Sequence, residues 1–417
     1  MTPPSRRLWH RIAVWLAAAA VGALALWLSD LLQPPAAAPV PGGHGEAFQA
    51  MSVDPLSLHG AFPQRILWPL LAWAFGFGGP GAPLFTQVCN GTLLAVVCWF
   101  CRQHGARWLD AVLVTVAVAL TGAVQVYKPL TCYSDTLNFI FLLLALHHVR
   151  RPAVFWSLVV LSAFSHEMVF FFAPWLVYER CRAGGLWWRE GLAMVGVAFV
   201  YLGWSQVVKA WGSGQSYDAA YYFANNFLPW GTLGLWALLA LMLLLEFGPL
   251  LAVIVWAWRT DRLQIGRWGP WLYTAGVLVM MVLAYDVMRF ASFAFLPLVL
   301  GAVALLQQRA GRAVFAALMA AGIGSYMWLH RVPGEVGGQV FSHVTGTMLE
   351  LGVLFDHTKF VTALLPRLWF GALVMAAAAA AVVAVGLCMA RRFPKVADAT
   401  HPQPVGSEPR TSWNASP

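Results

Sequence analysis

Charged side chains are scarce in this sequence. They make up only 10% of the 417 residues, whereas hydrophobic side chains make up 60% and the mean hydropathy is +0.68. A soluble chain carries about 25% charged residues, so this composition excludes a soluble globular domain. The net charge of +9 does not indicate a nucleic-acid partner, because Lys and Arg occur in short clusters between apolar blocks, as topology signals do.

Several motifs of well-known enzyme classes are absent. The sequence has no Gly-x-x-x-x-Gly-Lys-Ser/Thr phosphate loop, no His-Glu-x-x-His and no Gly-x-Ser-x-Gly, which argues against a nucleotide-driven pump, a zinc protease and a serine hydrolase. Cys98 and Cys101 form a Cys-x-x-Cys without a second pair, so no metal site is predicted from the cysteines. No segment alternates with the two-residue period of a membrane β-barrel.

Long apolar blocks are what the sequence has in abundance. A transmembrane helix needs roughly 20 apolar residues to satisfy its own backbone across about 30 Å of hydrocarbon. The blocks predict an all-α, polytopic transmembrane helix bundle with about ten crossings. The predicted spans are residues 12–32, 83–101, 111–126, 136–149, 190–208, 231–258, 268–285, 287–306, 313–330 and 368–389. The length of the first block and its Trp15 and Trp27 favour a retained anchor over a cleaved signal peptide.

Two apolar stretches are irregular. Residues 65–77 are short and are followed by Gly78–Gly79–Pro80–Gly81, and residues 153–177 are interrupted by Ser165–His166–Glu167. We predict that the first is an interfacial helix on the outer side. The second is predicted to be a re-entrant or broken pair of half-length helices, with membrane crossing as the alternative for both stretches.

The basic residues predict the orientation. With both irregular stretches treated as non-crossing, most of the 26 Lys and Arg residues fall on one side, which the positive-inside rule assigns to the cytoplasm. We therefore predict a multi-pass protein of the bacterial inner membrane with its N-terminus and C-terminus in the cytoplasm. Residues 1–390 form a single transmembrane domain, and residues 391–417 form a polar, disordered cytoplasmic tail. No feature predicts the oligomeric state.

Ionisable residues near the membrane boundaries are few, and each one is therefore informative. In this topology six of them gather on the outer side: Asp54, Arg65, Lys128, Asp135, Asp286 and Arg289. His166 and Glu167 of the broken stretch join them if its apex points to that side. A cluster of both signs at one face suits a ligand with an anionic, polar head.

The arginine and aspartate candidates each have a structural alternative. Arg65 opens an apolar helix, and it either clamps a phosphate or pairs with Asp54. Asp135 is either a normal helix cap or a chemical group. Asp286 and Arg289 are spaced i, i+3, so they either pair with each other or present Arg289 to a substrate phosphate.

Polar residues inside apolar stretches form the second group of candidates. His166 and Glu167 interrupt an apolar segment, and broken helices at membrane depth usually line a cavity. Glu246 is isolated within a predicted span. It either hydrogen-bonds within the bundle or marks a proton pathway.

Four short motifs together resemble the membrane-embedded glycosyltransferases of the GT-C type and their uncharacterised bacterial relatives. After an acidic first outer loop, the motifs are a Pro-x-Arg-x-Leu-x-Pro-Leu-like stretch from Pro63 to Leu70, Ser134–Asp135 at the start of a span, His166–Glu167 in a broken segment, and Asp286–Arg289 before a late span. The resemblance covers roughly residues 10–310 and implies a GT-C-like fold.

The resemblance also implies an activity. A transferase of this kind takes a sugar from a polyprenyl-phosphate donor and passes it to an envelope glycan, lipid or protein acceptor at the outer face. Asp54 would be the general base on the acceptor hydroxyl, with Asp135 and Glu167 as further candidates. Arg65 and Arg289 would hold the donor phosphate. The implied substrate-binding set is completed by Lys128, His166 and Asp286.

The expected ligands follow from this reading. The donor is a substrate, no organic cofactor is implied, and a divalent metal is compatible with the family. Many family members carry a paired acidic motif in the first loop, where this chain has only Glu46 and Asp54. The expected partners are membrane lipid, polyprenyl phosphate and a glycan or lipid acceptor.

Two other functions compete with the transferase. The first is a carrier or flippase for a lipid-linked or small polar solute. Carriers tend to hold ionisable groups at the membrane midplane between two related halves, whereas here most of them gather at one face. The second is a non-catalytic scaffold in cell-envelope polysaccharide assembly, which would tolerate loss of the Asp54 charge.

Overall fold

The computed structural model describes residues 4–32, 44–58, 63–128, 131–212, 243–244, 246–260, 268–283, 287–308, 310–331 and 365–392 of the chain. Within these ranges all regular secondary structure is helical, and no β-strand occurs. The all-α prediction is therefore confirmed.

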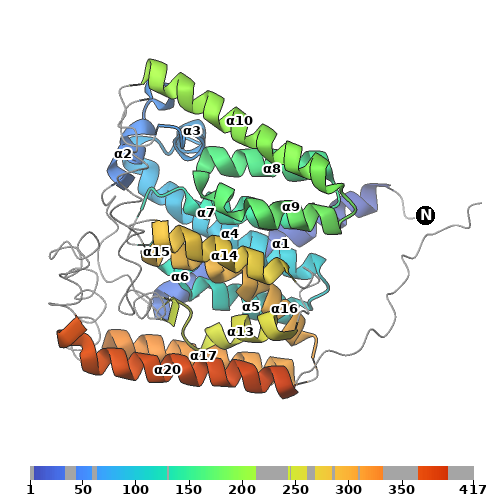
Figure 1. Ribbon diagram of the computed structural model, residues 1–417, viewed down its shortest axis with the longest axis vertical. Coiled ribbons are helices and arrows are strands. Elements are labelled where there is room, and N and C mark those ends of the chain that lie inside the picture. The colour runs from blue at the N-terminus through green and yellow to red at the C-terminus, as the bar shows by residue number, and fades with distance from the viewer. Residues whose placement is uncertain are drawn as a thin grey trace, which may run out of the picture.

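The longer helices run side by side across the molecule (Figure 1). The α-helices are α1 (Pro4–Leu32), α2 (His44–Met51), α3 (Leu67–Ala74), α4 (Ala82–Gln103), α5 (Trp108–Ala119), α6 (Gly122–Gln125), α7 (Asp135–His147), α8 (Pro152–Ser165), α9 (Ala173–Arg182), α10 (Trp187–Trp211), α13 (Leu251–Thr260), α14 (Gly269–Leu283), α15 (Val287–Ala291), α16 (Phe295–Leu306), α17 (Gly311–Arg331) and α20 (Leu365–Arg392). Short 3₁₀ turns connect some of them: η1 (Pro55–Ser57), η2 (Gly79–Gly81), η3 (Glu167–Phe172), η6 (Gly248–Leu250) and η7 (Ser292–Ala294).

Four helical stretches are long and apolar enough to cross a membrane. They are Leu8–Leu32, Gly79–Gln103, Trp187–Trp211 and Arg289–Leu306. Shorter apolar helices of 10–17 residues accompany them, among them Trp108–Ala119, Asp135–His147 and Pro152–Ser165. Helices of this length and composition fit the predicted polytopic membrane protein.

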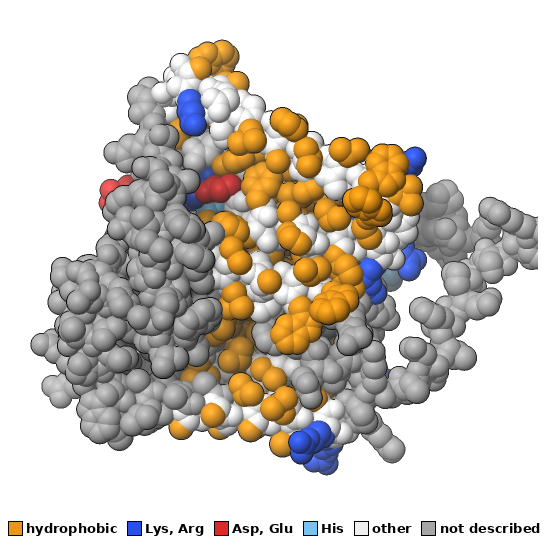
Figure 2. All heavy atoms as spheres, in the orientation of Figure 1, with side chains coloured by type: hydrophobic (Ala, Val, Ile, Leu, Met, Phe, Trp, Pro, Cys, Tyr) orange, Lys and Arg blue, Asp and Glu red, His pale blue; other side chains and the backbone are white. Residues whose placement is uncertain are grey.

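Burial separates central helices from peripheral ones. The most apolar part of the stretch Arg289–Leu306 is 94% buried, whereas the corresponding part of α10 is only 17% buried. The exposed side chains of α10 are large and hydrophobic, including Leu192, Phe199 and Leu202. Figure 2 shows hydrophobic side chains spread over this face of the molecule. Such a surface suits contact with lipid rather than water.

Small residues bring α1 and α4 into close contact. Ala18 and Ala25 of α1 are fully or almost fully buried. A Cβ added at Gly22 would lie 2.7 Å from the backbone nitrogen of Ala95 and 2.8 Å from the carbonyl oxygen of Gly91. Close backbone approach at small residues is a common way for helices to associate in membranes, where burial of apolar surface gives little driving force.

The interrupted stretch forms a helical hairpin. Helix α8 ends at Ser165, the chain turns at His166 and η3, and α9 runs back toward the start of α8 (Figure 1). Arg180 near the end of α9 donates a hydrogen bond to the carbonyl oxygen of Val149, which lies just before α8. Both ends of the hairpin therefore lie together. Helix α8 has 14 residues, which gives a length of about 21 Å.

The predicted interfacial helix also has a distinct direction. Helix α3 has eight residues, from Leu67 to Ala74. Figure 1 shows it nearly end-on, while the long helices run across the view, so α3 crosses the direction of the bundle. It lies toward the end of the bundle opposite the chain's N-terminus.

Basic residues collect at the other end of the bundle. Arg102 lies in the last turn of α4, Arg182 ends α9, and Arg391 and Arg392 end α20. Figure 2 shows Lys and Arg side chains along the edge of the molecule nearest the N-terminus. Arginines thus end several helices at this end of the bundle, and the positive-inside rule predicts that such an end faces the cytoplasm.

Candidate functional site

The apex of the hairpin is built around His166. Its backbone is extended, with φ −160° and ψ 127°, which ends α8. The ring atom Nδ1 accepts a hydrogen bond from the Met168 backbone N–H at 3.3 Å and so caps η3. Nε2 also faces a donor, Nη2 of Arg289 at 3.2 Å, and a neutral imidazole accepts at only one of its two nitrogens, so the tautomer decides which contact is a hydrogen bond. The His166 side chain thus stabilises the break in the helix, and the break places this side chain in the interior.

Hydrogen bonds also join the apex of the hairpin to helix α7. Asn138 donates a hydrogen bond from Nδ2 to the carbonyl oxygen of His166 at 3.3 Å, and it accepts one from the Ser162 hydroxyl. The Ser165 hydroxyl donates to the carbonyl oxygen of Ser134 at 2.9 Å. These bonds fasten the turn of the hairpin to the first turns of α7, where Asp135 begins the helix.

The connection before α7 adopts an unusual conformation. Cys132 is fully buried and has a φ of 70°, in the left-handed region that non-glycine residues rarely occupy. Its backbone N–H donates to the Thr86 hydroxyl of α4 at 2.8 Å. This residue sits immediately before Tyr133–Ser134–Asp135, so the conformation helps to set the direction in which Asp135 enters the interior.

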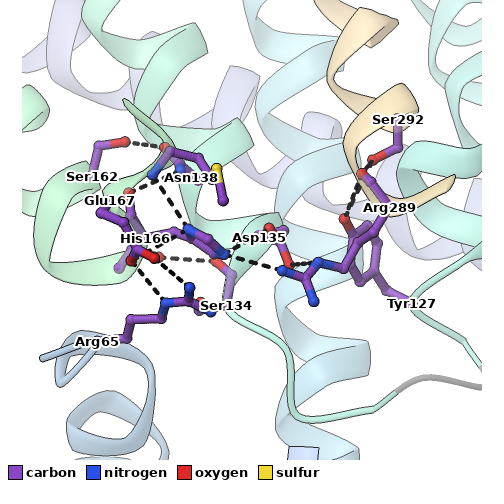
Figure 3. A network of polar contacts seen from close by, with 12 residues as sticks. Arg65, Tyr127, Ser134, Asp135, Asn138, Ser162, His166, Glu167, Arg289 and Ser292 are labelled. Atoms are coloured by element: carbon purple, nitrogen blue, oxygen red, sulfur yellow. Dashed lines mark hydrogen bonds and ion pairs between the residues drawn. The ribbon is translucent and has the colours of Figure 1, made fainter. Parts of the chain in front are cut away.

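Arg65 and Glu167 form the first ion pair of the site (Figure 3). The Nε atom of Arg65 donates to Oε2 of Glu167 at 2.8 Å, and its Nη2 atom donates to Oε1. This two-pronged arrangement is the strongest geometry for a guanidinium and a carboxylate. The pairing differs from the Arg65–Asp54 pair that the sequence also allowed. It joins the segment before α3 to the apex of the hairpin.

Asp135 and Arg289 form the second ion pair. Nε of Arg289 lies 3.0 Å from Oδ2 of Asp135. The guanidinium also lies 4.6 Å from the centre of the Tyr133 ring, a cation–π distance. Tyr127 and Ser292 contact the Arg289 backbone: the Ser292 hydroxyl donates to the Arg289 carbonyl oxygen at 2.5 Å, and the Tyr127 hydroxyl donates to it at 3.4 Å.

His166 connects the two ion pairs. Its Nε2 atom lies 3.5 Å from Oδ1 of Asp135 and 3.2 Å from Nη2 of Arg289, while Nδ1 lies 3.6 Å from Oε2 of Glu167. Figure 3 shows the imidazole between the two pairs. The result is a continuous polar network, hereafter the apex network, made of Arg65, Glu167, His166, Asp135 and Arg289.

The apex network is deeply buried and balanced in charge. The side chains of Asp135 and His166 are fully buried, and that of Arg289 is 5% exposed. Glu167 differs, because 25% of its side chain is exposed. Two arginines face two carboxylates, so with a neutral imidazole the formal charges cancel. Cancellation offsets the large cost of removing isolated charges from water.

Two predicted site residues, Asp54 and Lys128, are described and do not join the apex network. Asp54 is exposed and precedes η1. Lys128 is buried and binds elsewhere, with Nζ 2.6 Å from Oδ1 of Asp30 and 2.7 Å from the hydroxyl of Ser29 near the end of α1. Burial lowers the pKa of the Lys128 ammonium, and Asp30 opposes that shift. Asp286 lies outside the described residues.

A second buried carboxylate belongs to Glu246. Its side chain is almost fully buried, and its carboxylate packs directly against Gly122 at the start of α6. Any side chain at position 122 would collide with this carboxylate. Gly122 lies just after the interruption between α5 and α6, so the Glu246 carboxylate lies beside an interrupted helix.

Sequence reasoning missed several supporting residues of the site. Asn138, Ser162 and Tyr133 were not chosen, although each contacts a residue of the apex network or fastens its turn. A signal for Asn138 was present, because it follows Asp135 by three residues and shares its helix face. Ser162 gave no comparable signal, since serine is common in membrane helices.

The arrangement can bind an anion and exchange protons. Arg65 and Arg289 are bidentate donors of the kind that holds phosphate. An imidazole with a carboxylate beside each ring nitrogen can pass a proton from one to the other. Among the described residues, no group of three or more His, Cys, Asp or Glu side chains is placed to hold a metal ion.

No protein-family model, curated protein or solved structure matches this chain.

Proposed function

We propose that this protein is a membrane-embedded, glycosyltransferase-like enzyme of the GT-C type. It takes a sugar from a polyprenyl-phosphate donor and transfers it to an envelope glycan, lipid or protein acceptor at the outer face of the inner membrane. The supporting observation is the apex network, which gathers two arginines, two carboxylates and a histidine from distant parts of the chain.

The depth of the apex network supports a lipid-phosphate donor. Asp135 begins α7, and His147 ends this 13-residue helix at the basic end of the bundle. The length of this helix is about 20 Å. With its basic end at the cytoplasmic boundary of a hydrocarbon core about 30 Å thick, the apex network lies within about 10 Å of the outer boundary. The phosphate of a prenyl-linked donor enters the membrane near this level, while its chain stays in the hydrocarbon.

The proposed topology completes this placement. About ten helical crossings, counting α20 and the shorter apolar helices other than α8 as spans, leave the hairpin as a re-entrant pair and α3 at the outer interface. Both termini are then in the cytoplasm with the basic ends of α4, α9 and α20.

The proposed chemistry divides the roles among the residues. Arg65 and Arg289 stabilise the negative charge that develops on the donor phosphate as the sugar leaves. Asp54 is exposed on the outer side and takes the proton of the acceptor hydroxyl. Asp135 is fully buried in an ion pair, so it serves better to hold Arg289 than to meet an acceptor. Glu167 is the second candidate base.

A transfer assay tests the proposal. Purified protein in lipid is incubated with radiolabelled polyprenyl-phosphate sugars and envelope glycan acceptors, and the labelled product is measured. Arg65→Ala and Arg289→Ala are each expected to reduce transfer at least a hundredfold, because each removes a donor to the developing charge. Asp54→Asn is expected to abolish transfer. Activity that survives both arginine substitutions would contradict the phosphate-clamp role.

One observation favours a carrier as the second candidate. The Glu246 carboxylate is buried at an interrupted helix, and carriers use such sites to couple ions or protons to transport. Under this alternative, proteoliposomes containing the protein move a lipid-linked or polar solute in a proton-dependent way, and Glu246→Gln abolishes the proton dependence. The transferase predicts no such dependence.

A further inference from the structure

The two ion pairs of the apex network differ in accessibility. Asp135 is fully buried and the Arg289 side chain is 5% exposed, whereas a quarter of the Glu167 side chain is exposed. A ligand that arrives from outside therefore meets the Arg65–Glu167 pair first. Asp135 and Arg289 form the inner support.

The Arg65 side chain is more deeply enclosed than that of Glu167. The carbonyl oxygen of Gln64, the preceding residue, accepts a hydrogen bond from Nε1 of Trp204 in α10 at 3.1 Å. Trp68, the second residue of the following helix α3, is fully buried. The Glu167 backbone is also fixed, as the first residue of η3, but a quarter of its side chain is exposed against 3% for Arg65. Rotation of the Glu167 side chain therefore displaces fewer packed atoms than movement of the guanidinium.

A buried guanidinium needs an anion beside it at all times. Only 3% of the Arg65 side chain is exposed. Removing the carboxylate and leaving the charge alone would be costly, but exchanging one anion for another keeps the charge compensated. A phosphate presents oxygens that accept from a guanidinium in the same two-pronged way as a carboxylate does.

From these observations we infer that the Arg65–Glu167 pair is an exchangeable ion pair, in which the phosphate head of a lipid-linked ligand replaces Glu167 on Arg65. The displaced carboxylate stays beside Tyr201 of α10 and His166, which already neighbour it. Glu167 thus competes with the ligand until the ligand binds. The identity of the ligand rests on the proposed function, but the exchange itself does not require a sugar to be transferred.

The exchange predicts an unusual mutational result, because removing a site residue should tighten binding. The full-length protein in nanodiscs is titrated calorimetrically with farnesyl phosphate, and with farnesol as the uncharged probe. Glu167→Gln is expected to bind farnesyl phosphate about tenfold more tightly than the unaltered protein, since it removes the competing charge. Arg65→Gln is expected to lose the difference between farnesyl phosphate and farnesol.

Two further variants serve as controls for this titration. Glu190→Gln is the matched control, because Glu190 forms a similar two-pronged pair with Arg180 at the opposite end of the hairpin. It is expected to leave farnesyl phosphate binding unchanged. Glu167→Asp keeps the charge but shortens its reach, so it is expected to tighten binding in the same direction if Glu167→Gln does not fold.

The outcomes separate this inference from the proposed function. Equal or weaker binding of farnesyl phosphate in both Glu167 variants overturns the exchange, because Glu167 would then be a ligand contact rather than a competitor. Tighter binding together with no sugar transfer from any donor supports the exchange and contradicts the transferase. Sugar transfer without tighter binding of farnesyl phosphate supports the transferase and contradicts the exchange.

Discussion

At the scale of single residues, the inner ion pair offers the sharpest stability test. Asp135→Asn leaves the buried Arg289 guanidinium without the carboxylate that lies 3.0 Å away. Breaking a buried pair from one side costs about 3–5 kcal/mol. The double substitution Asp135→Asn with Arg289→Gln restores the charge balance, so it is expected to cost less than the sum of the two single substitutions.

Chemical unfolding of the purified protein in detergent measures these differences. Asp54→Asn is the control, because Asp54 is exposed and its substitution is expected to change stability by no more than about 0.5 kcal/mol. Strictly additive losses in the double variant would mean that Asp135 and Arg289 contribute independently and that the pair has no energetic coupling.

The backbone at Cys132 gives a second residue-scale prediction. A φ of 70° is strained for any side chain and most strained for a β-branched one. Cys132→Val is expected to destabilise the protein by about 1–3 kcal/mol, whereas Cys132→Gly relieves the strain and loses only a small buried side chain. Thermal unfolding checks the order of stability, glycine above valine.

A helical cysteine provides the comparison for Cys132. Cys98 is also fully buried, but it lies in the regular helix α4. Cys98→Val therefore tests the effect of adding volume without left-handed backbone, and it is expected to cost less than Cys132→Val. If both valine variants lose the same stability, packing rather than backbone strain explains the effect.

Residue chemistry alone predicted much of the apex network. Arg65, Asp135, His166, Glu167 and Arg289 were chosen because a charge in an apolar segment must have a partner or a use, and the structure brings these five together. The partners themselves could not be predicted. Arg65 and Glu167 are 102 positions apart, and a local spacing argument finds only neighbours such as Asp54 or Asp286.

Lys128 is a second case in which the sequence did not predict the partner of a charged residue. The sequence places it in an outer connection beside other charges, which suggests that it joins them. In the structure it fastens the end of α1 through Ser29 and Asp30 instead. Such a contact depends on how α1 packs against the rest of the bundle, and no periodicity or motif in the sequence specifies this.

At the scale of helices, the contact between α1 and α4 depends on the absence of a side chain at Gly22. A Cβ there would lie within 3 Å of two α4 backbone atoms, and a backbone cannot move aside as a flexible side chain can. Gly22→Leu is expected to separate the helices and to destabilise the protein by about 1–3 kcal/mol or more. The measurement is the melting temperature of the detergent-purified protein.

A glycine on the exposed face of α10 is the matched control. A Cβ added at Gly196 meets no atom within 4 Å. Gly196→Leu therefore adds the same side chain within a helix without a clash, and the better helix propensity of leucine favours it. Comparable losses of stability for Gly22→Leu and Gly196→Leu would show that close packing is not the reason for the glycine in α1.

The hairpin was the element that the sequence predicted best. Its two half-length helices follow from the polar interruption at Ser165–His166–Glu167 and from the arginines at both ends of the stretch. The hydrogen bond of Arg180 to Val149 agrees with this prediction, because it holds both ends together. The lengths of individual spans were harder to predict. Helices α5 and α7 are shorter than about 20 residues, since turns near the site take up part of each apolar block.

At the scale of the whole molecule, the arginines at one end of the bundle make the topology testable. Single cysteines are placed in a Cys388→Ser background, because Cys388 is the exposed native cysteine among the described residues. Leu56 lies at the end with α2 and α3, whereas Ala153 and Leu186 flank the hairpin at the basic end, and all three positions are exposed. Intact and permeabilised cells are then treated with a membrane-impermeant maleimide.

The hairpin and the orientation give separate readouts in this experiment. Leu56→Cys is expected to react in intact cells, while Ala153→Cys and Leu186→Cys are expected to react only after permeabilisation, because the positive-inside rule predicts that their arginine-rich end faces the cytoplasm. Reaction of Ala153→Cys and Leu186→Cys on opposite sides would mean that the hairpin crosses the membrane. If all three labels are reversed, the hairpin survives but the apex network faces the cytoplasm, and the proposed donor must then be presented from the inner leaflet.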